Sequence, residues 1–170
     1  MNSLFKMNIE IVQGNILDQK VSVIINPTNL NGYMGYGVGK AIVRAGGIEI
    51  ENQAVAKAPI LIGEPVMTTA GSLPFEAIIH TSTIDDSSQV LEKGLISKSL
   101  LGALLTADEA GFESVAVPGM GSGVGKLSVK DTAQAMFSAI EAFKPIHLKN
   151  IILVDLDLPV IMAWKELQKK

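Results

Sequence analysis

Two short glycine-rich segments are the part of this sequence whose residue types and spacing most favour ligand chemistry. Residues 35–40 and residues 121–126 both read Gly-x-Gly-Val-Gly-Lys, and each follows a hydrophobic segment and precedes a segment of helical composition. Alternating glycines let a backbone approach a ligand closely, and successive N–H groups can form a concave site for an anion. The motif therefore predicts two main-chain phosphate loops; the alternative is that the glycines only make tight strand-to-helix turns.

Two better-known phosphate motifs do not fit either copy. A P-loop needs a glycine five positions before the last glycine of the motif, and Met34 and Met120 stand there. A dinucleotide-binding fingerprint needs a third glycine where Lys40 and Lys126 stand.

Polar side chains that follow predicted strands are the remaining candidates. Asn15, Asn26 and Asn29 are each open to a ligand contact or to an ordinary turn role, because asparagine favours turns. Asp155 follows the last predicted strand and is a candidate ligand residue, whereas Asp157 before Pro159 is expected to cap a helix. Two histidines and no cysteine predict that the chain holds no metal and no other cofactor.

The elements that must position these residues follow from hydrophobic patterning. Strands are predicted at 8–12, 21–25, 65–70, 76–81, 114–117 and 150–154, with the second strand stopping at Asn26-Pro27. Helices are predicted at 40–45, 48–58, 88–110, 128–143 and 159–169. This order predicts a single α/β domain over residues 1–170, with helices on both faces of a mixed, mostly parallel sheet of about six strands.

Composition excludes several classes of function. The net charge is −3, and Arg44 is the only arginine among fourteen basic residues, which disfavours binding to a DNA or RNA duplex. No apolar stretch approaches the roughly 18 residues of a membrane span, and the start lacks an apolar segment of signal-peptide length. The expected class is a cytoplasmic protein without a membrane partner, and the sequence leaves its oligomeric state open.

Four motifs in order resemble the macro domain family over about residues 8–155. They are Gly14-Asn15-Ile16-Leu17, Asn26-Pro27-Thr28-Asn29, the first glycine loop with Ala41-Ile42, and the loop from Pro118 to Gly125. The resemblance implies a three-layer α/β/α sandwich that binds ADP-ribose or an ADP-ribosylated substrate. Some family members also hydrolyse ADP-ribosyl esters or O-acetyl-ADP-ribose.

The resemblance also assigns roles to residues. Asn15, with the adjoining Ile16, takes the place of the aspartate that reads the adenine amine. Asn29 takes the place of the asparagine that bonds the distal ribose, and in a hydrolytic member it would help to position the attacking water. The phosphate loops correspond to Gly35, Tyr36, Gly37, Val38, Gly39, Pro118, Gly121, Ser122, Gly123, Val124 and Gly125.

Four departures from the family pattern bear on function. Asn15 replaces a carboxylate with a neutral amide, and Tyr36 replaces the middle glycine of the first loop. Gly39 stands where many hydrolytic members carry an aspartate, and Gly125 where many carry an aromatic residue. The sequence therefore predicts an ADP-ribose binder with hydrolysis left open, and the alternative is a non-catalytic binder of another nucleotide or phosphate-bearing metabolite.

Overall fold

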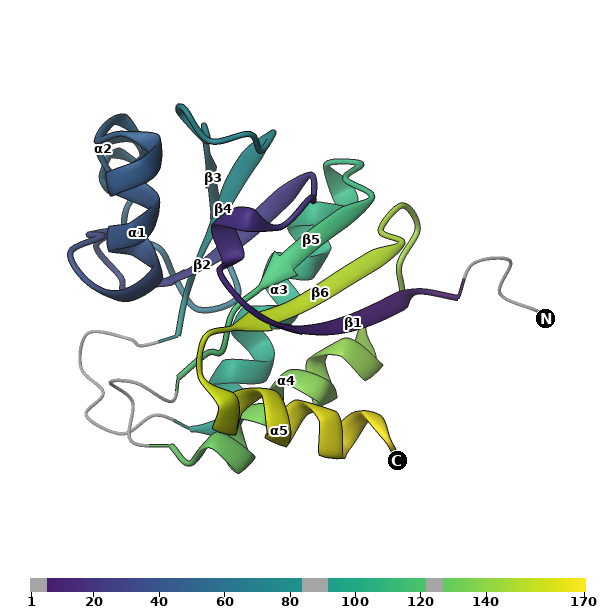
Figure 1. The fold of residues 1–170 in the computed structure, drawn as a ribbon. Helices are drawn as coiled ribbons and strands as arrows, with labels where there is room; N and C mark the ends of the chain where they lie inside the picture. The colour runs from purple at the N-terminus through teal and green to yellow at the C-terminus, as the bar shows by residue number, and fades with distance from the viewer. Residues whose placement is uncertain (1–5, 84–91, 122–126) are drawn as a thin grey trace.

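A six-stranded sheet lies at the centre of the computed structural model, which describes residues 6–83, 92–121 and 127–170 (Figure 1). The spatial order is β1-β6-β5-β2-β4-β3, and every neighbouring pair is parallel except the antiparallel pair β3 and β4. The predicted mixed, mostly parallel sheet is confirmed. The strands are β1 (Asn8–Gln13), β2 (Val23–Thr28), β3 (Val66–Thr68), β4 (Ala77–Ser82), β5 (Ser114–Val117) and β6 (Asn150–Asp155).

Helices cover both faces of this sheet, as the sequence predicts. The α-helices are α1 (Gly37–Gly46), α2 (Glu49–Ala56), α3 (Lys93–Glu109), α4 (Val129–Ala142) and α5 (Leu158–Gln168), and a short 3₁₀ helix η1 (Ile16–Asp18) follows β1. Figure 1 shows α1 and α2 on one side of the strands, and α3, α4 and α5 on the other.

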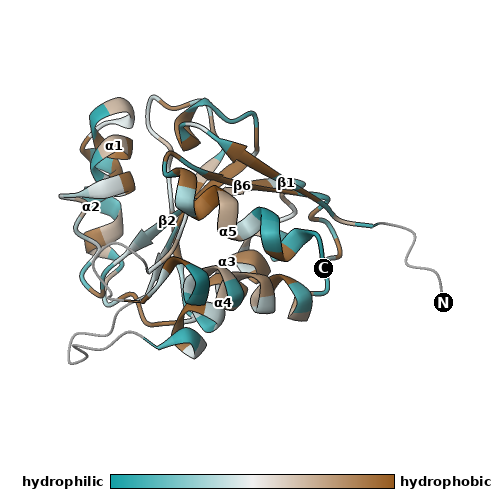
Figure 2. Cartoon of the chain, turned by 60° about the horizontal axis from the view of Figure 1, so that its bottom comes forward, coloured by the Kyte–Doolittle hydropathy of each residue, from teal (hydrophilic) through white to brown (hydrophobic). Residues whose placement is uncertain are grey.

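Alternation along the strands builds two separate cores. Val23 and Ile25 of β2 face the larger core with α3, α4 and α5, whereas Ile24 faces the smaller core with α1 and α2. Successive strand residues point to opposite faces, so a strand covered on both sides must be apolar throughout. Figure 2 shows apolar stretches along the strands and alternating polar and apolar stretches on the helices.

The end of β2 differs from the sequence prediction. The strand does not stop at Asn26-Pro27 but runs through both residues to Thr28. Its register with β5 covers only Val23 and Ile24, whereas its register with β4 continues to Thr28. Beyond Ile24 only one neighbouring strand needs hydrogen bonds, and proline, which has no N–H, is tolerated at such a position.

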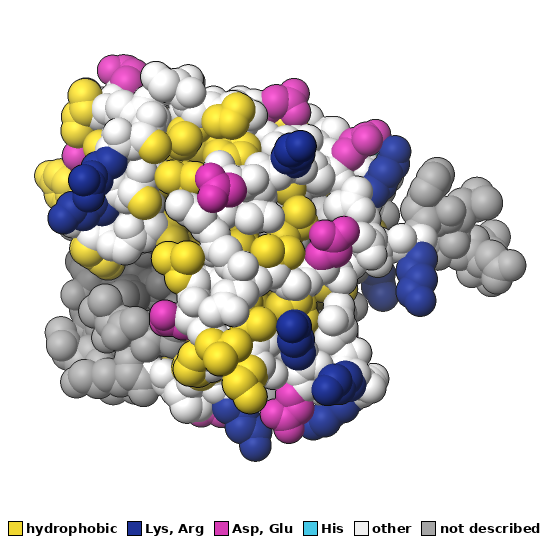
Figure 3. Space-filling model, in the orientation of Figure 1, with side chains coloured by type: hydrophobic (Ala, Val, Ile, Leu, Met, Phe, Trp, Pro, Cys, Tyr) yellow, Lys and Arg dark blue, Asp and Glu magenta, His cyan; other side chains and the backbone are white. Residues whose placement is uncertain are grey.

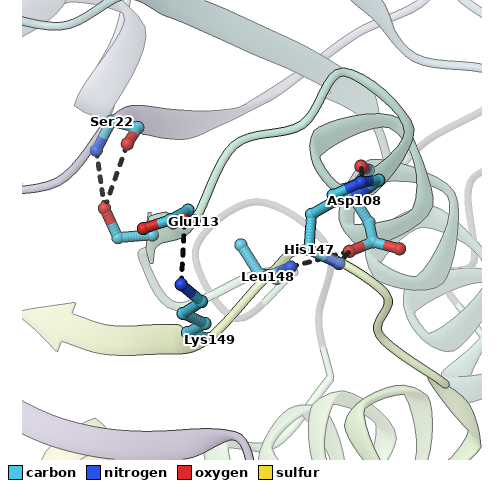
Figure 4. Close-up of polar contacts among 7 residues, drawn as sticks. Ser22, Asp108, Glu113, His147, Leu148 and Lys149 are labelled. Atoms are coloured by element: carbon cyan, nitrogen blue, oxygen red, sulfur yellow. Dashed lines mark hydrogen bonds and ion pairs between the residues drawn. The ribbon is translucent and has the colours of Figure 1, made fainter. Parts of the chain in front are cut away.

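At the end of the sheet opposite the carboxyl end of β2, the carboxylate of Asp108 binds the segment that leads into β6 (Figure 4). Asp108, near the end of α3, accepts backbone N–H bonds from Ile146 (3.0 Å), His147 (2.7 Å) and Leu148 (2.7 Å), which lie just before β6. Burial alone raises the pKa of Asp108, but the three N–H donors outweigh it and hold the pKa below its usual value. A charged group thus fixes the approach of the chain to β6.

Among the residues that the structure describes, no helix combines the length and the apolar character needed to cross a membrane.

Candidate functional site

A cleft of about 370 Å³ opens where the carboxyl ends of β1, β5 and β6 meet the start of α1. In open α/β sheets, ligands bind outside the carboxyl ends of the strands. Larger hollows of about 530, 560 and 690 Å³ lie elsewhere, and their linings include none of the predicted site residues. The cleft is lined by Gly14, Asn15, Ile16, Gly37, Val38, Ala41, Pro118, Val154, Asp155, Leu156 and Asp157.

The cleft brings together predicted residues from four separate segments. Asn15 and Ile16 follow β1, Pro118 follows β5, and Asp155 ends β6. The start of α1 adds Gly37 and Val38 from the first glycine loop. Pro118 lies three residues before the second glycine segment, of which only Gly121 is among the described residues, and Gly121 does not line the cleft.

The start of α1 offers main-chain N–H groups to the cleft. No side chain caps the helix at Tyr36, so the N–H groups of its first turn have no capping side chain. Gly37 has φ +57°, a left-handed conformation that favours glycine. Among the described residues, a Cβ at Gly35 or Gly37 would meet no atom within 4 Å apart from its chain neighbours, so the described structure gives no steric reason for the glycine at 35.

Asn15 presents the nitrogen of its side-chain amide. Its Oδ1 accepts the N–H of Leu17 at 2.9 Å, which caps η1, and its backbone oxygen accepts from Gln19 at 2.8 Å. The oxygen already accepts one hydrogen bond, whereas Nδ2 has none among the described residues, so the nitrogen is the more available end of this exposed side chain for a ligand in the cleft.

Asp155 joins the loops that follow β1, β5 and β6 at the cleft. Its Oδ2 accepts the N–H of Gly119 at 3.0 Å, and its Oδ1 accepts the N–H of Asp157 at 2.9 Å. Its backbone oxygen accepts the N–H of Gly14 at 3.0 Å. Its carboxylate therefore braces the loops after β5 and β6 while lining the cleft.

Other predicted residues lie outside the lining of this cleft. Asn29 is bonded within its own turn, where its Oδ1 accepts the N–H of Asn31 (3.0 Å) and its Nδ2 donates to Tyr33 O (3.3 Å). Asn26 and Gly39 are buried, whereas Tyr36 is 54% exposed. Gly35 and Gly121 are also absent from the lining, and Ser122, Gly123, Val124 and Gly125 lie outside the described residues.

Sequence reasoning missed Asp157 as a site residue. It occupies the N-cap position of α5, as predicted, but its side chain makes no capping hydrogen bond. It lines the cleft instead, together with its neighbour Leu156. The available signal was its place two residues after a parallel strand, at the edge where ligands bind.

The electrostatics of the cleft are those of main-chain groups and carboxylates. None of its lining residues is Lys, Arg or His. Figure 3 shows basic and acidic side chains mixed over this face of the molecule. Within the described ranges, no group of three or more His, Cys, Asp or Glu could hold a metal ion. An anion in this cleft would be held by N–H groups rather than by side-chain charge.

Comparisons with known proteins agree with this architecture. An uncharacterized protein of Aquifex aeolicus is 42% identical over 160 residues, which cover 94% of this chain and 97% of that protein. An uncharacterized protein of Mycobacterium tuberculosis is 32% identical over 146 residues, which cover 86% of this chain and 40% of that protein.

Solved structures show the same fold. A macrodomain of Oceanobacillus iheyensis with MES bound superposes with a TM-score of 0.86 at 24% identity, covering 99% of this chain and 95% of that one. A macrodomain of Trypanosoma brucei in complex with ADP-ribose superposes with a TM-score of 0.84 at 18% identity, covering 95% and 69%. The Macro domain family model matches residues 25–136, and with the fold described above the chain belongs to the macro domain family.

Proposed function

We propose that this chain binds ADP-ribose, or a close derivative of it, in the cleft at the carboxyl edge of the sheet. The observation that carries the proposal is the uncapped first turn of α1, which lines the cleft with Gly37 and Val38 and has open space at Gly35 and Gly37. A helix N-terminus with free N–H groups suits a diphosphate, and the described lining of the cleft, which holds no basic side chain, needs such donors. Membership of the macro domain family and the ADP-ribose complex of the Trypanosoma brucei macrodomain support the same ligand.

Each end of the ligand has a separate partner in this proposal. The diphosphate lies on the start of α1 and reaches toward the second glycine segment. The base lies against Asn15, Asp155 and Asp157 at the other end of the cleft. Since Asn15 offers a donor instead of an acceptor, a nucleotide whose base has an acceptor at that edge is the second candidate ligand.

Hydrolysis of ADP-ribosyl esters is not part of the proposal. Gly39 stands where many hydrolytic relatives carry an acid, and a Cβ there would lie 3.2 Å from Met34 Cα and Cβ. Both polar atoms of the Asn29 amide are engaged within their own turn. An assay for release of ADP-ribose from an ester-modified protein tests this exclusion.

The binding proposal is tested by filling the cleft from α1. Ala41 lines the cleft and is half-buried, whereas Ala45 lies one turn further along the same helix and is exposed. Ala41→Phe should weaken binding of ADP-ribose at least about tenfold by calorimetry, because the ring occupies space that the ligand needs. Ala45→Phe makes the same change in helix propensity and should bind like the unaltered protein. Equal affinities for the two variants would place the ligand elsewhere.

A further inference from the structure

A chain of buried polar side chains crosses three strands on the face of the sheet that α1 and α2 cover. Thr68 of β3 contacts His80 of β4, with 2.8 Å between Thr68 Oγ1 and His80 Nε2. His80 in turn contacts Asn26 of β2, with 3.1 Å between His80 Nδ1 and Asn26 Nδ2. All three residues are at most 5% exposed, although they continue the face that carries apolar Ile24 and Ile78. Burying three polar groups is costly unless each is paired, so their pairing fixes how each one is oriented.

The hydrogen bonds of these three side chains all run in one direction, with Asn26 donating to His80 and His80 donating to Thr68. The Thr68 hydroxyl donates its one hydrogen to the backbone oxygen of Thr69 at 3.0 Å, so toward His80 it can only accept. His80 therefore carries its proton on Nε2, and its Nδ1 accepts from the amide nitrogen of Asn26. Burial and nearby Lys57 lower the pKa of His80 to about 4, which keeps the ring neutral at ordinary pH.

These hydrogen bonds fix the position of the side-chain oxygen of Asn26. With its nitrogen held by His80, Asn26 turns its Oδ1 away from β4, and this buried oxygen finds no hydrogen-bond partner among the described residues. The Oδ1 atom lies 3.5 Å from the position that a Cβ on Gly39 would take. Gly39 belongs to the first turn of α1, where the helix carries its partial positive charge. The oxygen thus lies beneath the helix end that opens onto the cleft.

A buried acceptor without a hydrogen-bond partner destabilises the folded state, so another favourable interaction of this oxygen is expected. The opposite charges of the oxygen and the helix end attract one another. A side chain has no room at Gly39, because an added Cβ would lie 3.5 Å from Asn26 Oδ1 and 3.2 Å from Met34 Cα, so the backbone of the first turn packs close to the Asn26 amide. A shift of the amide would therefore move the first turn of α1 with it.

We propose that Thr68, His80 and Asn26 form a positioning relay that holds the first turn of α1 at the height above β2 at which its N–H groups face the phosphates of the ligand. These are positioning residues, since none of them lines the cleft. The inference rests on the proposed function, because it takes the start of α1 to be the diphosphate site. It gives buried Asn26 a role through its side chain rather than through contact with the ligand.

Two substitutions of His80 separate the two halves of the relay. His80→Asn places an amide oxygen near the former Nδ1, so Asn26 keeps its acceptor and Thr68 loses its donor. His80→Gln places an amide near the former Nε2, so Thr68 keeps its donor and Asn26 loses its acceptor. Both variants shorten or reshape a fully buried ring, so they serve as matched controls for lost packing.

The expected result is a difference in affinity that stability does not explain. His80→Asn should bind ADP-ribose within about threefold of the unaltered protein, whereas His80→Gln should bind about tenfold or more weakly. In the free proteins, NMR should show shifted amide signals of Gly37, Val38 and Gly39 in His80→Gln but not in His80→Asn. Equal affinities, or losses that follow the free energy of unfolding alone, would overturn the relay.

Two further readouts keep the test decisive. The ¹⁵N signals of His80 in the unaltered protein should report a proton on Nε2, and a proton on Nδ1 would contradict the proposed direction. If the His80 variants do not fold, Thr68→Ser keeps the hydroxyl and Thr68→Val removes it, and only Val should shift the amides of Gly37 to Gly39. If the unaltered protein binds no ADP-ribose, the proposed function fails, while these NMR measurements on the free protein still decide the relay.

Discussion

Replacing Asn15 with aspartate should reverse which purine base the cleft prefers, from a 6-oxo base to adenine. The oxygen that caps η1 is retained, because an aspartate Oδ1 can still accept the N–H of Leu17 at 2.9 Å. The second atom of the side chain changes from an N–H donor to a charged acceptor. The exocyclic amine of adenine is a donor, so it conflicts with the amide nitrogen of Asn15 and suits the oxygen of an aspartate.

The magnitude follows from the kind of hydrogen bond gained. A neutral hydrogen bond contributes about 1 kcal/mol and one to a charged group about 1.5–3 kcal/mol, so Asn15→Asp should tighten ADP-ribose by about 1–1.5 kcal/mol, or roughly five- to tenfold. The corresponding ligand with a 6-oxo base, inosine diphosphate ribose, should weaken instead, because its acceptor then meets a carboxylate.

Calorimetric titration of both ligands into both proteins measures the ratio of their dissociation constants. Asn52→Asp, at an exposed position of α2, controls for the added negative charge. Parallel shifts for the two ligands, or none, would show that the base does not contact residue 15 and would refute the assignment.

Three other changes probe stability and chemistry. The pKa of His80 is lowered from 6.5 to about 4, so the unfolded chain binds a proton in that window that the folded chain does not. Stability should therefore be complete above about pH 6.5 and fall by about 3 kcal/mol toward pH 4, a slope that urea titrations should find missing in His80→Asn. Asp108→Asn places an N–H₂ group against backbone N–H donors and should lower the free energy of unfolding, measured in urea at pH 7, by about 2–3 kcal/mol. Because the pKa of Asp108 is lowered in the folded protein, the stability advantage of the aspartate over the asparagine should fade as the pH falls through that lowered pKa. A difference in stability that stays constant with pH would contradict this account. Gly39→Asp should lower the melting temperature, because a Cβ would lie 3.2 Å from Met34, and should not create ester hydrolysis in an ADP-ribose release assay.

Local patterning was enough to predict most of the sheet. The run at 114–117 is β5 to the residue, and the predicted strand at 21–25 overlaps β2 from Val23 to Ile25, because parallel strands covered on both faces must be apolar throughout. The continuation of β2 through Pro27 could not be predicted, because it depends on β5 leaving the register early, a relation between segments far apart in the chain.

The candidate site was predictable to the extent that it lies at strand ends. Asp155 was a candidate because it follows the last predicted strand, and Asn15 because it matches the adenine-reading position that the resemblance implies; both line the cleft. The orientation of the Asn15 amide and the pairing of Asn26 with His80, 54 residues away, depend on individual hydrogen bonds in the folded chain. A sequence alone gives the residue types for such bonds but not their partners.

The two walls of the cleft come from stretches of chain that are remote from one another. The wall with Asn15 is built by the turn after β1 and the turn after β6, which Asp155 and Gly14 fasten together, while the opposite wall is the start of α1. Substitutions on the first wall would therefore change the proposed contacts to the base without disturbing the start of α1, the proposed anion site.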